Sequence, residues 1–144
     1  MVTQAASTDA RELARLAIQM WTDNTLDGLE SEFSEIIRSE NAVCFIKYAE
    51  DQPIGFAQCN LRYDYVEGTK TSPVGYLEGI FIQEEFRRRG FARELLTECE
   101  KWAKSKNCTE FASDCELNNA DSLKFHYALG FDETNRIICF KKSI

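Results

Sequence analysis

The segment from Gly75 to Lys106 constrains the fold most, because an apolar stretch runs through a short basic turn into an amphipathic pattern. Residues 75–83 are mostly apolar, which predicts a buried strand near the middle of a sheet. From Gly90 onward, apolar side chains recur every three or four positions and predict a helix with one buried face: Ala92, Leu95, Leu96, Cys99, Trp102 and Ala103. Residues 108–116 predict another strand. A strand, helix and strand in this order predict a right-handed parallel crossover.

The other segments predict an α/β (α+β) domain with a mixed central sheet flanked by helices. A turn at Glu50 to Pro53 joins two strands into a hairpin. The expected elements are a helix starting near Thr8 or Asp9, a helix at 26–39, strands at 42–49 and 54–63, a loop at 64–73, a helix at 119–129 and a terminal strand at 136–142. A length of 144 residues predicts a single domain over residues 1–144.

Composition narrows the class of protein. No apolar run approaches the roughly 20 residues of a membrane span, and the first ten residues lack the basic and apolar parts of a signal peptide. The six cysteines form no C-x-x-C pair, so we expect buried reduced thiols and no metal site. A formal net charge of −7 disfavours nucleic acid as a partner and is compatible with a cationic substrate. We therefore expect a soluble cytoplasmic protein with no membrane or nucleic-acid partner.

The basic turn predicts an anion-binding site. It carries Arg87, Arg88 and Arg89, followed by Gly90 where the helix begins, in a chain that is otherwise acidic. A helix N-terminus offers unpaired backbone N–H groups and a partial positive charge. A glycine allows the backbone to approach a ligand closely. The turn therefore favours a phosphate or pyrophosphate group.

The pattern Arg87-x-x-Gly90-x-Ala92 resembles the pyrophosphate loop of the GNAT acetyltransferases, and the order of the expected elements is similar to the GNAT fold. The resemblance implies acetyl-CoA as co-substrate. Backbone N–H groups near Ile80 to Ile82 would then hold the thioester arm, and Asn119 would belong to a second cofactor motif. The cofactor-binding residues implied are Ile80, Phe81, Ile82, Arg87, Arg88, Arg89, Gly90, Phe91, Ala92, Arg93 and Asn119.

Further motifs resemble the bacterial aminoglycoside 6′-N-acetyltransferases, the antibiotic-resistance branch of that family. They are Tyr63-Asp64-Tyr65-Val66-x-Gly68, Ser72-Pro73-Val74, Leu77-Glu78-Gly79-Ile80-Phe81, Ala112-Ser113-Asp114 and His126-x-x-Leu129-Gly130-Phe131-x-Glu133-Thr134. The resemblance implies acetyl transfer to the 6′-amino group of an aminoglycoside. The candidate substrate contacts are Trp21, Asn24, Tyr65, Glu78 and Asp114. For the aromatic residues, ordinary core or rim packing is the alternative.

Two carboxylates support a cationic substrate independently of the resemblance. Glu78 and Asp114 each interrupt an apolar stretch, and a buried carboxylate is costly unless it is paired. We expect both to orient the substrate amine first and to remove its proton second. For each of them, a salt bridge to a neighbouring Lys or Arg is the alternative.

The general acid is less clear from sequence. Many GNAT enzymes place a tyrosine four residues before the Gly-Phe pair, where this chain has His126, its only histidine, with Tyr127 beside it. His126 has a suitable intrinsic pKa for a catalytic acid, although packing is an equal alternative. A second departure is Asn135, at a position where the resembled enzymes often carry a glutamate.

Other functions remain open at this stage. One is a GNAT enzyme for another amine, such as a polyamine or a protein N-terminus, and the other is a non-catalytic acetyl-CoA-binding module. Enzymes of the resembled branch are often dimers that exchange C-terminal strands. A homodimer is therefore expected, with residues 136–142 as the exchanged strand.

Overall fold

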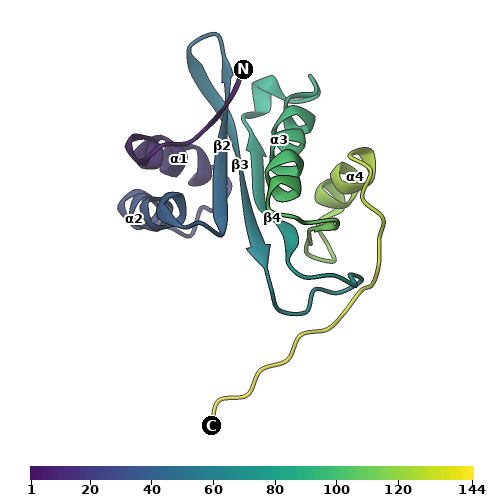
Figure 1. Ribbon diagram of the computed structural model, residues 1–144. Coiled ribbons are helices and arrows are strands. Elements are labelled where there is room, and N and C mark those ends of the chain that lie inside the picture. Colours follow the sequence, from purple (N-terminus) through teal and green to yellow (C-terminus); the bar gives the residue numbers. More distant parts are fainter.

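The computed structural model describes residues 1–144 and places a five-stranded mixed sheet between helices (Figure 1). The strands lie side by side in chain order: β1 (Val2–Gln4), β2 (Ala42–Ala49), β3 (Gln52–Arg62), β4 (Val74–Ile82) and β5 (Phe111–Ala112). The first four are antiparallel to their neighbours, whereas β4 and β5 are parallel. The parallel pair confirms the crossover expected from the strand–helix–strand segment, and the mixed sheet confirms the fold class.

Helices cover both faces of the sheet (Figure 1). Helices α1 (Ala10–Ala17) and α2 (Leu26–Arg38) pack on one face, and α3 (Phe91–Ser105) packs on the other. Helix α4 (Ala120–Ala128) lies beyond α3, and two short 3-10 turns, η1 (Ser7–Asp9) and η2 (Glu84–Phe86), precede α1 and α3. Each helix is therefore close to its expected position, with bounds that differ by one or two residues.

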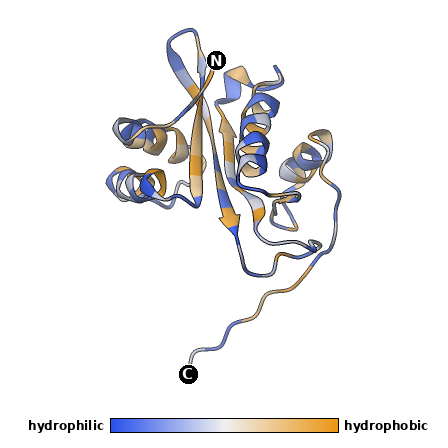
Figure 2. Cartoon of the chain, viewed as in Figure 1, coloured by the Kyte–Doolittle hydropathy of each residue, from blue (hydrophilic) through white to orange (hydrophobic).

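The alternation of side chains along the strands builds two cores. On β2, Cys44 and Ile46 point toward α1 and α2, whereas Val43 and Phe45 point toward α3. Figure 2 shows the resulting hydrophobic strands and the two-sided hydropathy of the helices. Fully burying a side chain of this size contributes roughly 1.5–3 kcal/mol. The α1–α2 core and the α3 core therefore hold the sheet from both sides.

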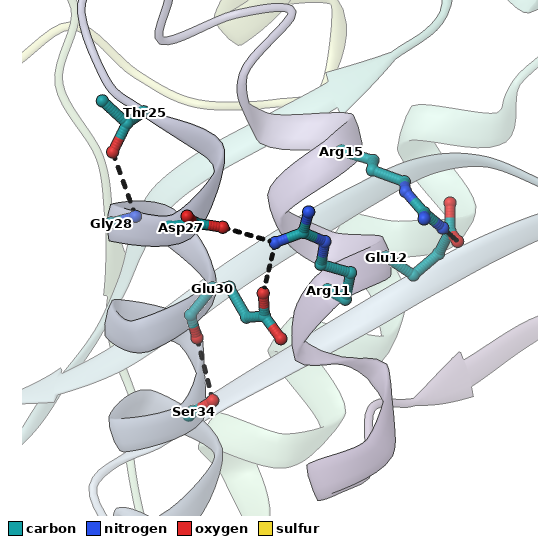
Figure 3. Close-up of polar contacts among 8 residues, drawn as sticks. All are labelled: Arg11, Glu12, Arg15, Thr25, Asp27, Gly28, Glu30 and Ser34. Atoms are coloured by element: carbon teal, nitrogen blue, oxygen red, sulfur yellow. Dashed lines mark hydrogen bonds and ion pairs between the residues drawn. The ribbon is translucent and has the colours of Figure 1, made fainter.

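Polar contacts fix α1 against α2 (Figure 3). The Nη1 of Arg11 lies 2.7 Å from Oδ1 of Asp27 and 2.6 Å from Oε2 of Glu30. Thr25 caps α2, because its Oγ1 accepts a hydrogen bond from the backbone N–H of Gly28 at 3.1 Å. The ion pairs of Arg11 and the cap at Thr25 therefore fix the start of α2 beside α1.

A buried lysine anchors the start of α3. Lys47 of β2 has 5% of its side chain exposed, and its Nζ lies 2.6 Å from Oε2 of Glu94 and 4.5 Å from the ring centroid of Phe91. Burial is the largest influence on Lys47 and lowers its pKa, but the hydrogen bond to Glu94, the contact with the N-terminus and the charge of Glu94 together outweigh it, so the pKa is raised. The first turn of α3 is thus held on the sheet by a charged pair.

Three expectations about strands are wrong. The strand expected at 108–116 is only Phe111–Ala112, and residues 136–142 form no strand. The strand at 74–82 is fourth in the sheet, so β3 is the middle strand. A strand needs a hydrogen-bonding neighbour, and the C-terminal tail finds none in its own chain (Figure 1). The three-residue β1 was missed because so short a segment shows no alternating pattern.

Candidate active site

The site is built where β4 and β5 part. Their ladder consists of Gly75 opposite Phe111 and Tyr76 opposite Ala112, and it ends there although β4 continues to Ile82. The outer edge of β4 beyond Tyr76 therefore has no strand beside it. This edge includes Ile80, Phe81 and Ile82, the residues expected to hold a thioester arm.

A bulge in β4 changes the direction of the Glu78 side chain. On β3, the consecutive residues Gln58 and Cys59 face Gly79 and Leu77 respectively, so Glu78 is the extra residue between them. Such a bulge bends the strand and redirects a side chain. Glu78 consequently lies at the irregular point of β4, next to the end of the β4–β5 ladder.

The basic turn has the backbone geometry of an anion site. Arg88 and Gly90 have φ angles of +62° and +81°. The backbone N–H groups of Arg88, Arg89 and Gly90 donate no hydrogen bond within the protein, and the first turn of α3 adds the unpaired donors of any helix start. Several donors in succession therefore converge at the N-terminus of a 15-residue helix.

The arginine side chains of this region are mostly engaged by the backbone. Arg87 Nε donates to the carbonyl oxygen of Ile82 at 2.8 Å, and Arg89 Nη2 donates to that of Glu85 at 3.2 Å. Arg93 Nη2 donates to the carbonyl oxygen of Ala128 at 2.7 Å and so ties α3 to the end of α4. These bonds hold the cationic groups around the turn.

Glu78 already has a cationic partner within the chain. Its Oε1 accepts from Nε and Nη2 of Arg62 at 3.0 and 2.9 Å, and its Oε2 accepts from Nη2 at 3.0 Å. The Glu78 side chain is 24% exposed, and Cζ of Arg62 lies 3.4 Å from the ring centroid of Tyr76. The salt-bridge alternative for Glu78 is therefore correct, and its carboxylate is already paired before any substrate binds.

Asp114 follows β5 and is exposed, unlike the strand position expected for it. Its Oδ2 accepts a hydrogen bond from the hydroxyl of Tyr76. Burial and this bond raise the pKa of Tyr76 well above its usual value. We call Arg62, Tyr76, Glu78 and Asp114 the Arg62 cluster, because the arginine and the tyrosine connect the two carboxylates.

Trp21 belongs mainly to the α1–α2 core. Its ring stacks on Phe33 at 6.4 Å and meets Phe56 edge-on at 5.8 Å. It also lies against Gly79 of β4, where an added Cβ would be 2.7 Å from its Cζ2. Asn24 donates from Nδ2 to the carbonyl oxygen of Trp21 at 3.2 Å. Trp21 therefore packs against the bulged part of β4, and Asn24 is bonded to its backbone.

A cavity of about 750 Å³ opens between β5, α4 and the loop after β3. Tyr65, Asp114 and His126 line it, and Tyr65 is 79% exposed. Trp21 and Glu78 do not line it. Glu78 is connected to the cavity through its partner Arg62, which lines the cavity. Trp21 lies apart from it, in the α1–α2 core.

His126 is hydrogen-bonded on both ring nitrogens. Nε2 lies 2.7 Å from Oγ of Ser113, and Nδ1 lies 2.7 Å from the carbonyl oxygen of Ser122. Asn119 caps α4, since its Oδ1 accepts from the backbone N–H of Ser122 at 3.1 Å. Asn135, in the tail, donates from Nδ2 to Oε1 of Glu67 at 2.9 Å.

The sequence did not single out Arg62, Tyr76 or Ser113. Their partners come from other elements, and only the strand register brings them together. The one available signal was the position of Ser113 directly before Asp114. No group of three His, Cys, Asp or Glu side chains is placed to hold a metal ion, and none of the helices has the length and apolarity needed to cross a membrane.

Comparisons with known proteins agree with this geometry. An aminoglycoside N(6′)-acetyltransferase type 1 from Acinetobacter haemolyticus is 36% identical over 99% of this chain and 98% of its own length. One from Salmonella enteritidis is 38% identical over 98% and 97%. Among solved structures, AAC(6′)-Iy in complex with the bisubstrate analog CoA-S-monomethyl-acetylneamine has a TM-score of 0.95 at 38% identity, covering 100% of this chain and 98% of that one. Residues 10–131 match the Acetyltransferase (GNAT) family, and the chain is a member of that family.

Proposed function

We propose that this protein transfers the acetyl group of acetyl-CoA to the 6′-amino group of aminoglycoside antibiotics and thereby confers resistance. The observation that carries the proposal is the fold match, at 38% identity and over the full chain, to AAC(6′)-Iy bound to a CoA–aminoglycoside bisubstrate analog. Two features of this chain supply the chemistry: the uncovered outer edge of β4 and the run of free N–H groups at the start of α3.

Each of these two features suits one part of acetyl-CoA. A pyrophosphate suits the unpaired donors of Arg88, Arg89 and Gly90, where the helix dipole adds positive potential. The thioester arm then runs along the uncovered edge of β4, with Ile80 and Ile82 offering backbone donors to its carbonyl oxygens. One such donor stabilises the oxyanion that forms when the amine attacks. Asn119, whose side chain caps α4, is the proposed contact from the second cofactor motif.

The carboxylates of Asp114 and Glu78 orient the substrate amine and help to deprotonate it. An alkyl ammonium resembles lysine, with a pKa of about 10.4, so forming the neutral amine at pH 7 costs roughly 4–5 kcal/mol. Asp114 orients the ammonium and takes its proton directly or through water. Glu78 adds negative charge beside it, and that charge is already shared with Arg62. The guanidinium moderates the negative potential, which would otherwise raise the pKa of the amine and oppose its deprotonation.

The C-terminal tail suggests a homodimer. Ile138 and Phe140 are 80% and 91% exposed on an extended segment that leaves the body of the protein (Figure 1). β5 forms one edge of the sheet, so its outer side can accept another strand. A tail exchanged between two copies would pair its backbone and bury these side chains. A cytoplasmic location accords with the six free cysteines, four of them buried thiols.

A coenzyme A thiol-release assay tests the function. Acetyl-CoA is supplied with kanamycin, with spermidine or with a peptide panel, and turnover of kanamycin is expected. Activity on peptide or spermidine but not on kanamycin would favour a GNAT enzyme for another amine. Tight CoA binding without turnover of any amine would favour a non-catalytic binding module. In cells, Asp114→Asn is expected to abolish drug tolerance while leaving CoA binding intact.

A further inference from the structure

Ser113 lies at the point where the two parallel strands separate. The last paired residues are Tyr76 and Ala112, so Ser113 is the first residue of its segment without a partner on β4. Its Oγ is 3.4 Å from the carbonyl oxygen of Leu77, the first residue of β4 beyond the ladder. It also lines the 750 Å³ cavity together with Asp114 and His126. The hydroxyl is therefore placed at the closed end of the opening between the strands.

The contacts of His126 decide which ring nitrogen carries the proton. A carbonyl oxygen only accepts, so the 2.7 Å contact with the Ser122 carbonyl requires a hydrogen on Nδ1. In the neutral ring, Nε2 is then an acceptor, and the hydroxyl of Ser113 donates to it at 2.7 Å. Edge contacts with the rings of Phe125 and Phe131, at 5.5 and 5.2 Å, fix the orientation of the imidazole. The pair is thus set to receive a proton through Ser113.

Neither nearby tyrosine is free to take this part. The hydroxyl of Tyr76 donates to Asp114, and burial together with that bond raises its pKa, which makes it a weaker acid. The hydroxyl of Tyr127, which also lines the cavity, donates to Glu133. Ser113 is the hydroxyl that faces both His126 and the opening.

We propose that Ser113 and His126 form a two-way proton relay between the attacking nitrogen and the leaving sulfur. The proposal rests on the acetyl transfer proposed above. Attack by the neutral amine forms the C–N bond and leaves a positive nitrogen and a negative oxygen. Ser113 Oγ takes a proton from that nitrogen while its own proton passes to Nε2 of His126. The ring becomes an imidazolium that donates to Ser113 and to the Ser122 carbonyl.

The return step restores the starting state. The oxyanion re-forms the carbonyl, the C–S bond breaks, and its electron pair leaves on the sulfur. Ser113 gives its proton to the thiolate and recovers one from Nε2 of His126. The products are the amide and the free thiol, with His126 neutral again. The other proton of the original ammonium goes to solvent before attack, so every proton and charge is accounted for.

Kinetics of Ser113→Ala test the relay. We expect kcat to fall by about 100-fold, the lower end of general acid–base contributions, with little change in the KM for acetyl-CoA. The solvent isotope effect on kcat and the pH dependence of kcat should both change. Ser113→Thr keeps a hydroxyl and should retain most of kcat. Ser105→Ala is the matched control, since that hydroxyl also bonds a main-chain carbonyl but lies at the far end of α3.

Non-additivity gives a second kinetic criterion. Because the two groups act as a unit, Ser113→Ala/His126→Gln should be no slower than either single variant. A kcat within twofold of the unsubstituted enzyme for Ser113→Ala, with the same pH profile, would overturn the relay alone. Absence of turnover of any amine by the unsubstituted protein would overturn the proposed reaction itself. The same assays on spermidine or peptide serve if kanamycin is not the amine accepted.

The single histidine provides a test that needs no turnover. In untagged protein with ¹⁵N-labelled histidine, NMR signals of one imidazole report its tautomer directly. The relay requires the neutral form with hydrogen on Nδ1, and Ser113→Ala should shift the Nε2 resonance while leaving the tautomer unchanged. Hydrogen on Nε2 in the neutral form would overturn the relay even if the serine variant folded poorly.

Discussion

The guanidinium of Arg62 binds both carboxylate oxygens of Glu78 at 2.9–3.0 Å, so this site holds an internal counterion. Charge-assisted contacts with two nitrogens of one arginine are among the stronger protein hydrogen bonds. The guanidinium also stacks on Tyr76, whose hydroxyl holds Asp114. Of the two carboxylates proposed to meet the substrate ammonium, one is therefore already neutralised. The chain supplies a weaker negative potential than its acidic residues alone would indicate.

Glu78→Gln is expected to weaken substrate binding. The substitution removes the carboxylate and leaves the Arg62 cation without its partner, so a cationic substrate gains repulsion as well as losing attraction. The KM for kanamycin should rise about tenfold, or about 1.4 kcal/mol, with the KM for acetyl-CoA unchanged. Adding Arg62→Gln should recover part of the loss. Glu40→Gln, an exposed glutamate near the end of α2, is the control, and equal KM values in Glu78→Gln and this control would refute the assignment.

Gly90→Asp is expected to weaken CoA binding strongly. Gly90 has a φ of +81°, and an added Cβ would meet no protein atom within 4 Å, so the protein itself creates no clash. The loss should come from backbone strain of about 1–2 kcal/mol and from repulsion of the phosphates. Gly90→Ala carries the strain without the charge. Calorimetry should therefore rank affinity as unsubstituted, then alanine, then aspartate; equal affinities for both variants would exclude the electrostatic contribution.

Sequence patterns predicted what depends on local periodicity. The helical stripe that includes Leu95 and Cys99 and the strand–turn–helix order were enough to place α3 and the parallel crossover. The end of the β4–β5 ladder, the bulge at Glu78 and the pairing with Arg62 were not predictable, because they depend on the register between distant segments. The arrangement of the candidate substrate residues was not predictable either, because Trp21 packs in the α1–α2 core and Glu78 is connected to the cavity through Arg62.

Gly79→Ala is expected to displace Trp21. The new Cβ would lie 2.7 Å from Cζ2 and 3.0 Å from Cη2 of the indole, and rigid ring atoms cannot yield without moving the whole side chain. Overpacking of this kind costs about 1–3 kcal/mol. Chemical denaturation should show the lower stability, and tryptophan fluorescence should shift as the ring moves. Gly28→Ala is the comparison, because its close neighbour is the hydroxyl of Thr25 at 2.8 Å, a smaller group on the surface of α2. An unchanged spectrum in Gly79→Ala would mean that the indole does not depend on this glycine.

Ile138→Asp and Phe140→Asp are expected to disrupt the proposed dimer. Both side chains are exposed in the single chain and would become buried only if the tail pairs with another copy. A charge placed there should shift sedimentation toward the monomer without lowering the stability of the domain. Ser31→Asp adds the same charge on the exposed face of α2 and should leave the oligomeric state unchanged. A monomer for the unsubstituted protein at micromolar concentration would dismiss strand exchange.

Glu110→Gln is expected to reduce the acid sensitivity of folding. Oε1 of Glu110 accepts from the backbone N–H groups of Lys70 and Thr71, each at 2.8 Å, and from the hydroxyl of Thr71, which clamps the loop before β4. The Thr71 hydroxyl and these amides lower the pKa of Glu110 below its ordinary 4.5. The native state therefore binds this proton more weakly than the unfolded chain does. The stabilisation is complete above the ordinary pKa and is lost as the pH falls through the lowered one.

The midpoint of thermal unfolding should show this difference. At neutral pH, Glu110→Gln should melt below the unsubstituted protein. The gap should narrow as the pH falls below 4.5 and should close once the pH is below the lowered pKa, where both carry a neutral side chain. The exposed-site variant Glu40→Gln should run parallel to the unsubstituted protein over the same range. If the difference in unfolding midpoint between Glu110→Gln and the unsubstituted protein does not change with pH, the ionised carboxylate is not its cause. The lower stability would then come from altered hydrogen-bond geometry.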